Sequence, residues 1–136
     1  MLDIFIRALF FIVGLINFTP LTGVLGQAKL QALYGINTAS PDLLLLLQHR
    51  AILFGIVGGM LLLASIRRSF RITAAIAGGI SMVGFLLLAK LGDPSLGAIN
   101  AQLTRVFTID VVAIILLTLA VAGHFWQEKK VVENTV

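Results

Sequence analysis

Residues 40–71, SPDLLLLLQHRAILFGIVGGMLLLASIRRSFR, contain one complete apolar segment and the link to the next. Ser40 can cap a helix, Pro41 suits its first position, and Asp42 complements the helix dipole. The run 43–66 is long enough to cross a hydrocarbon core of about 30 Å at about 1.5 Å per residue. The short link RRSFR then predicts a tight helical hairpin with the apolar run 72–89.

Two further apolar segments, 4–25 and 106–126, have a similar length. Inside lipid a backbone must satisfy its own hydrogen bonds, so all four segments are expected to be helices. The stretch GQAKLQALYG (26–35) has apolar side chains at helical spacing and predicts a short helix lying on the membrane surface. The sequence LGDPS (91–95) is expected to end the third helix and to start the fourth at Asp93-Pro94. We therefore predict a single all-α domain over residues 1–136, an integral membrane four-helix bundle with a short interfacial helix between helices one and two.

Composition supports a membrane protein, because 59% of the residues are apolar and only 12% are charged. A soluble domain is usually about half apolar and about a quarter charged. The absence of cysteine excludes disulfides, thiolate metal sites and cysteine nucleophiles. The net charge of +4 comes from cations at the segment ends, where they fix topology and meet lipid head groups, so no nucleic-acid partner is expected.

The distribution of lysine and arginine predicts the orientation. Four spans place both termini on one side, and that side holds six cations (Arg7, Arg67, Arg68, Arg71, Lys129, Lys130) against four on the other. The positive-inside rule then predicts a multi-pass membrane protein with both termini in the cytoplasm. Insertion in both orientations is the alternative.

The polar residues inside the spans fall into one layer, in the outer third of the membrane. Arg50 and Asp110 lie at a similar depth in the second and fourth helices, and Asn17 reaches the same depth in the first. Ionisable groups within spans usually face the bundle interior and are paired. An ion pair between Arg50 and Asp110 is therefore predicted, with Arg105 as a competing partner for Asp110.

This polar cluster, His49, Arg50, Arg105, Asp110 and Asn17, has several interpretations. The ion pair can lock two helices together, it can also line a ligand pocket, or Arg50 can extend to the lipid head groups instead. Because cations outnumber the single acid, a pocket here suits a small anionic or lipid-like ligand. A hydrogen bond between helices is favoured for His49 over a metal or haem ligand, so no catalytic residue, cofactor or metal is assigned.

The motif GIVGG places Gly55 and Gly59 at the spacing that lets membrane helices approach closely. Packing between the second and third helices of one chain is the favoured interpretation. A homodimer through Gly55 and Gly59 is the alternative.

The combination of LYGI, HRAILFGIVGG and TRVFTIDVV resembles small uncharacterised bacterial four-helix inner-membrane proteins that are DoxX-like in layout. The resemblance implies the same cluster, His49, Arg50, Arg105 and Asp110. Some of these proteins carry the name phosphopantetheine adenylyltransferase, an enzyme with a Rossmann-like fold and a (T/H)xGH motif. The nearest match in this chain is VAGH at 121–124, and a P-loop pattern is absent, so the sequence does not support adenylyl transfer.

Three functions follow from these observations. The favoured one is a non-enzymatic membrane protein whose net-positive pocket binds or passes a small anionic or amphipathic ligand, or which serves as a partner subunit. The first alternative is a membrane enzyme, or a subunit of one, acting on a quinone or isoprenoid with His49 transferring a proton. The second is a small proton-coupled exporter in which Asp110 titrates.

Overall fold

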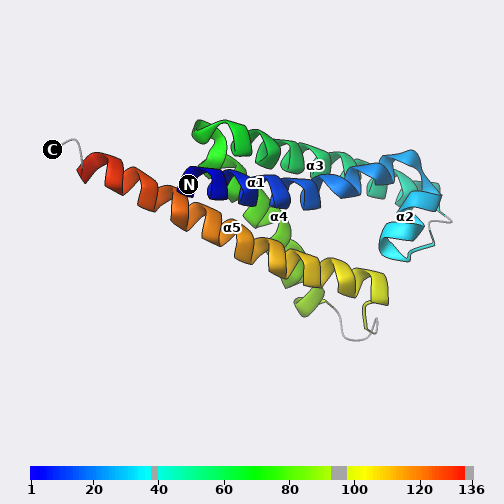
Figure 1. Cartoon of the computed structure of the whole chain (residues 1–136). Coiled ribbons are helices and arrows are strands. Elements are labelled where there is room, and N and C mark those ends of the chain that lie inside the picture. Colours follow the sequence, from blue (N-terminus) through cyan, green and yellow to red (C-terminus); the bar gives the residue numbers. More distant parts are fainter. Residues whose placement is uncertain (38–39, 93–97, 134–136) are drawn as a thin grey trace.

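The computed structural model describes residues 1–37, 40–92 and 98–133, and it is helical with no strand in these ranges. The elements, coloured along the chain in Figure 1, are α1 (Leu2–Phe18), η1 (Thr19–Leu25), α2 (Gln27–Tyr34), α3 (Pro41–Ile66), η2 (Arg68–Phe70), α4 (Arg71–Leu91) and α5 (Ala101–Glu133). The predicted all-α class and the short helix between the first two long ones are confirmed. The expected helix start at Asp93-Pro94 lies outside the described residues.

Four segments are long and apolar enough to cross a membrane: Leu2–Leu25, Pro41–Ile66, Arg68–Leu91 and Ala101–Glu133. Each contains one of the four spans predicted from the sequence. The start of α1, the end of α5 and η2 lie toward one end of the molecule in Figure 1, and α2 lies at the other. We call these the termini end and the α2 end.

Local sequence explains where α3 begins, where α1 passes into a 3₁₀ helix, and where the chain turns on either side of α2. The Ser40 hydroxyl accepts a hydrogen bond from the Leu43 amide at 3.5 Å, with proline and aspartate in the first turn, as predicted for the start of α3. Pro20 has no N–H to donate, so the α-helical ladder of α1 ends at Phe18 and the chain continues as a 3₁₀ helix. Gly26 and Gly35, with φ of 113° and 65°, adopt the positive φ values needed for the turns on either side of α2.

Helix α1 packs between α3 and α5, while α4 packs against α3 and α5 on their other side. Small residues allow the closest approach, between α1 and α3. A Cβ atom on Gly58 would lie only 2.5 Å from the backbone nitrogen of Phe18, and one on Gly55 would lie 2.7 Å from the Leu21 side chain. Gly55 is thus used within the chain, whereas Gly59 has open space beside it. The homodimer through Gly55 and Gly59 stays a prediction.

The apolar core joins α1, α3, α4 and α5 and is made of Ile6, Leu9, Phe10, Val13, Leu61, Ala64, Ala74, Met82, Ala113, Leu117 and Ala120. In the view of Figure 1, α4 and α5 diverge from α1 and α3 toward the α2 end. Helices that diverge leave less apolar contact between them, and the two hollows described next lie where the core ends.

Candidate functional site at the α2 end

Arg50 is half-buried and lies among three aromatic rings contributed by three helices. Its guanidinium carbon is 5.9 Å from the ring centre of Tyr34 in α2, 5.1 Å from Phe54 in α3 and 5.6 Å from Phe85 in α4. At these distances each ring face attracts the cation by about 0.5–2 kcal/mol, more where water is excluded. Aromatic rings, rather than a carboxylate, therefore hold the charge of Arg50.

The predicted ion pair between Arg50 and Asp110 is not formed. No nitrogen of Arg50 lies within 4.0 Å of the Asp110 carboxylate, and no described residue forms an ion pair with either side chain. The reason is the arrangement of the bundle, since α3 and α5 each pack on α1 and α4 and lie diagonally opposite one another. Depth alone placed the two residues in one layer but did not fix the direction in which they point.

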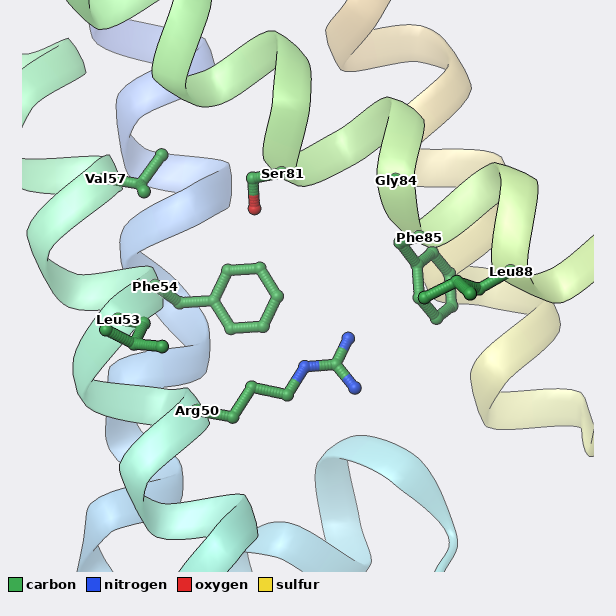
Figure 2. Close-up of a pocket in the computed structure, with 8 residues that line it drawn as sticks. All are labelled: Arg50, Leu53, Phe54, Val57, Ser81, Gly84, Phe85 and Leu88. Carbon is green, nitrogen blue, oxygen red and sulfur yellow. The ribbon is translucent and has the colours of Figure 1, made fainter.

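Arg50 extends into a groove between α3 and α4, which Figure 2 shows from the side. This α3–α4 groove has a volume of about 270 Å³ and is lined by Arg50, Leu53, Phe54, Val57, Ser81, Gly84, Phe85 and Leu88. Gly84 has open space where a side chain would stand, which keeps the groove wide on the α4 side. The guanidinium is the one charged group in a lining that is apolar except for Ser81, and it makes no hydrogen bond to the residues that the structure describes.

Asp110 lines a second hollow, enclosed by α1, η1, α2, α3 and α5. This Asp110 cavity has a volume of about 210 Å³ and is lined by Ile16, Asn17, Thr19, Pro20, Leu33, Tyr34, Phe54, Val106, Ile109 and Asp110. Asn17 donates its amide to the Val13 carbonyl at 3.1 Å and to the Met82 sulfur at 3.5 Å, so its donors are already used. The Asp110 carboxylate accepts no hydrogen bond from the described residues.

The groove and the cavity share a wall, because Phe54 lines both. Tyr34 lines the cavity that contains Asp110, and the Arg50 guanidinium lies over its ring, so Tyr34 is a neighbour of both charged groups. It is 4% exposed, and burial raises the pKa of its phenol, while Arg50 lowers that pKa and Asp110 raises it further. Tyr34 therefore lies within the electrostatic reach of both Arg50 and Asp110.

The other two residues of the predicted cluster point elsewhere. His49 and Arg105 are exposed, and neither lines the α3–α4 groove or the Asp110 cavity. His49 is adjacent to Arg50 in sequence and so lies about 100° around the helix from it. Across the ranges 1–37, 40–92 and 98–133, no cluster of three histidine or acidic side chains could hold a metal ion.

Sequence reasoning missed the most deeply buried charge, Arg71, which is 0% exposed at the termini end. Its Nη2 lies 2.9 Å from Asp3 Oδ1, its Nε donates to the Ala64 carbonyl at 3.4 Å, and its guanidinium carbon is 6.0 Å from the ring centre of Phe10. Asp3 and Arg7 have the i, i+4 spacing of a surface ion pair, but Arg7 donates to the Ser65 carbonyl at 3.0 Å instead.

A signal for Arg71 was present in the link RRSFR, where all three arginines were interpreted only as topology signals. A link this short brings the start of α4 against the bundle, where a residue at the end of the link can face inward. Arg68 remains exposed and donates to the side-chain oxygen of Gln127 at 2.9 Å. Arg71 is the cation that faces inward.

No protein-family model, curated protein or solved structure matches this chain.

Proposed function

We propose that this chain is a multi-pass inner-membrane protein of the DoxX-like four-helix layout that binds an anionic amphiphile in the α3–α4 groove. The observation that carries the proposal is the guanidinium of Arg50, which lies in an apolar groove without a carboxylate or hydrogen-bond partner among the described residues. A planar guanidinium binds phosphate or carboxylate oxygens through two parallel hydrogen bonds.

The rest of the groove suits an acyl chain. Leu53, Val57 and Leu88 provide apolar walls, and Ser81 and Gly84 leave room between the helices (Figure 2). With both termini in the cytoplasm, as the lysine and arginine distribution favours, the α2 end lies at the outer leaflet. The head group of a bound lipid would then meet Arg50 in the outer third of the bilayer, with its chain along the groove.

The two alternative functions have less support. A proton-transferring enzyme needs His49 beside Arg50 in one cavity, and His49 is exposed outside both hollows. An exporter needs Asp110 to be reached from both sides of the membrane in turn, and the Asp110 cavity is lined by residues of the α2 end. Binding is therefore the function that we propose.

The test is lipid binding by the purified full chain in detergent micelles, with dioleoyl phosphatidylglycerol adducts counted by native mass spectrometry. Arg50→Gln is expected to weaken binding about tenfold or more, since a hydrogen bond to a charged group contributes about 1.5–3 kcal/mol. Arg105→Gln, which removes an exposed arginine of α5, is the matched control and should bind as the natural chain does.

Arg50→Lys keeps the charge but loses the planar fork, so we expect it to bind between these two variants. Equal binding by the Arg50→Gln variant and the natural chain would overturn the proposal. Thermal melting of each variant in the same micelles shows whether a loss of binding reflects a loss of fold.

A further inference from the structure

We propose that the bound amphiphile carries, in addition to the anionic group that pairs with Arg50, an ammonium group that pairs with Asp110, as in a phosphoethanolamine lipid head group. This inference rests on the proposed function and specifies its ligand. It is drawn from the placement of two opposite charges on either side of a shared aromatic wall.

The first step is that neither charge is neutralised within the described part of the chain. Among the described residues, the interactions of the Arg50 guanidinium are with aromatic rings, and no cation lies within 4.0 Å of the Asp110 carboxylate. Unpaired charges inside an apolar bundle are costly, and the usual arrangement is direct pairing. Here the two charges are close enough to act on the same phenol, yet they do not touch.

The second step is that the hollows holding the two charges are neighbours that share a wall. Phe54 lines both the α3–α4 groove and the Asp110 cavity, and the Tyr34 ring lines the cavity with the Arg50 guanidinium over its face. A head group that extends past the edge of this wall, beside Phe54 and Tyr34, would have the cation of Arg50 on one side and the carboxylate of Asp110 on the other.

The third step is the chemistry of the ligand that satisfies both. A purely anionic head group would pair with Arg50 but would be repelled by Asp110. An amphiphile with only an ammonium group would pair with Asp110 but would be repelled by Arg50. A phosphate joined to a primary ammonium by two carbons carries both charges on one small head group, and its ammonium hydrogens can donate to the Asp110 oxygens. The apolar groove beside Arg50 accommodates the chains of a lipid rather than a free soluble head group.

The experiment compares dioleoyl phosphatidylethanolamine with dioleoyl phosphatidylglycerol, two lipids with the same chains and the same phosphate. Binding to the full chain in micelles is measured by native mass spectrometry, and the readout is the ratio of the two affinities. We expect the natural chain to prefer phosphatidylethanolamine by about tenfold, the scale of one charge-assisted hydrogen bond. Asp110→Asn should abolish that preference while keeping or improving binding of phosphatidylglycerol.

Two further variants separate the possible failures. Asp42→Asn alters an exposed aspartate at the start of α3 and should leave the affinity ratio unchanged. Arg50→Gln should weaken both lipids to a similar extent. If Arg50→Gln weakens both but Asp110→Asn leaves the ratio as it is in the natural chain, the zwitterion proposal is wrong and the proposed function stands. If Arg50→Gln weakens neither, the proposed function itself is wrong.

Asp110→Asn is expected to retain phosphatidylglycerol binding, and this retained binding would show that the variant is folded. A loss of both lipids together with a lowered melting temperature would show that Asp110 has a structural role, and it would overturn the assignment of the ammonium to this carboxylate.

Discussion

Arg71 and Arg50 show two ways in which an apolar bundle holds a fixed positive charge. Arg71 is completely buried and pairs with Asp3 at 2.9 Å, whereas Arg50 is half-buried and lies among aromatic rings. The side chain of Asp3 is 38% exposed, so the two members of the Asp3–Arg71 pair differ in how well they can be solvated when alone. Removing Asp3 and removing Arg71 should therefore lower the stability of the fold by different amounts.

We predict that Asp3→Ala destabilises the fold more than Arg71→Met does. Removing Asp3 leaves a buried guanidinium without a counter-charge; the loss is about 3–5 kcal/mol when both members of a pair are buried, and smaller here because Asp3 is 38% exposed. Removing Arg71 leaves a carboxylate that solvent can reach. The double variant should therefore melt at a higher temperature in micelles than Asp3→Ala alone.

The matched control for Asp3→Ala is Asp42→Ala, because Asp42 also lies in the first turn of its helix but forms no ion pair among the described residues. Any decrease in melting temperature that the two variants share is caused by the loss of an acidic side chain from the first turn of a helix, where it stabilises the helix dipole. A double variant that melts at or below the temperature of Asp3→Ala would contradict the prediction.

At the scale of elements, α2 closes the end of the bundle that holds the candidate site. It is only eight residues long, too short to be stable alone, so its burial against η1 and α5 has to hold it in place. Leu30 and Tyr34 are its buried residues, at 0% and 4% exposure. Tyr34 is therefore both a packing residue and part of the candidate site.

Tyr34 gives this region a specific titration signal, because it is the only tyrosine of the chain. Its pKa is raised above the ordinary 10.0, so the folded state favours the neutral phenol. The neutral phenol of Tyr34 makes its full contribution to the free energy of unfolding below pH 10.0, the pKa of an unfolded tyrosine. That contribution is lost as the pH rises through the pKa of Tyr34 in the folded protein. We predict a phenolate absorbance midpoint above 10.0 in micelles.

The same titration tests the electrostatic arrangement around Tyr34. Arg50→Gln should move the phenolate midpoint upward and Asp110→Asn should move it downward, because these residues act on the phenol with opposite signs. The Tyr34→Phe variant should lose less melting temperature between neutral and alkaline pH than the natural chain. A midpoint at or below that of the denatured chain would show that Tyr34 is not buried in this way.

At the scale of the whole molecule, the distribution of lysine and arginine predicts that η2 faces the cytoplasm and α2 faces outward. The chain has no cysteine, so single cysteines can report each side. In intact cells a membrane-impermeant maleimide should label Ala32→Cys in α2 but not Ser69→Cys in η2, both of which are exposed positions. The inverse pattern would reverse the orientation, and partial labelling of both would indicate insertion in both orientations.

Hydropathy and segment length were enough to predict four long helices, because these properties depend on each stretch alone. The partner of Arg50 could not be predicted in the same way, because it depends on how α3 is rotated. That rotation is set by packing: Gly58 faces Phe18 of α1 and Gly55 faces Leu21 of η1, which turns Arg50, Phe54 and Val57 toward α4. Arg71 was missed for the same reason, since the six cations assigned to the termini end were counted by side of the membrane and not by the face of their helix.

Helix α5 is 33 residues long, which corresponds to about 50 Å of helix, whereas a typical hydrocarbon core is about 30 Å thick. In a bilayer the excess has to be absorbed by tilt or by projection into water. Trp126 and Lys130, whose ring and ammonium lie 5.3 Å apart, are the kinds of side chain that fix such a helix at the boundary. Because α5 packs along α4, which forms one wall of the groove, we expect a change in bilayer thickness that tilts α5 to alter the width of the groove.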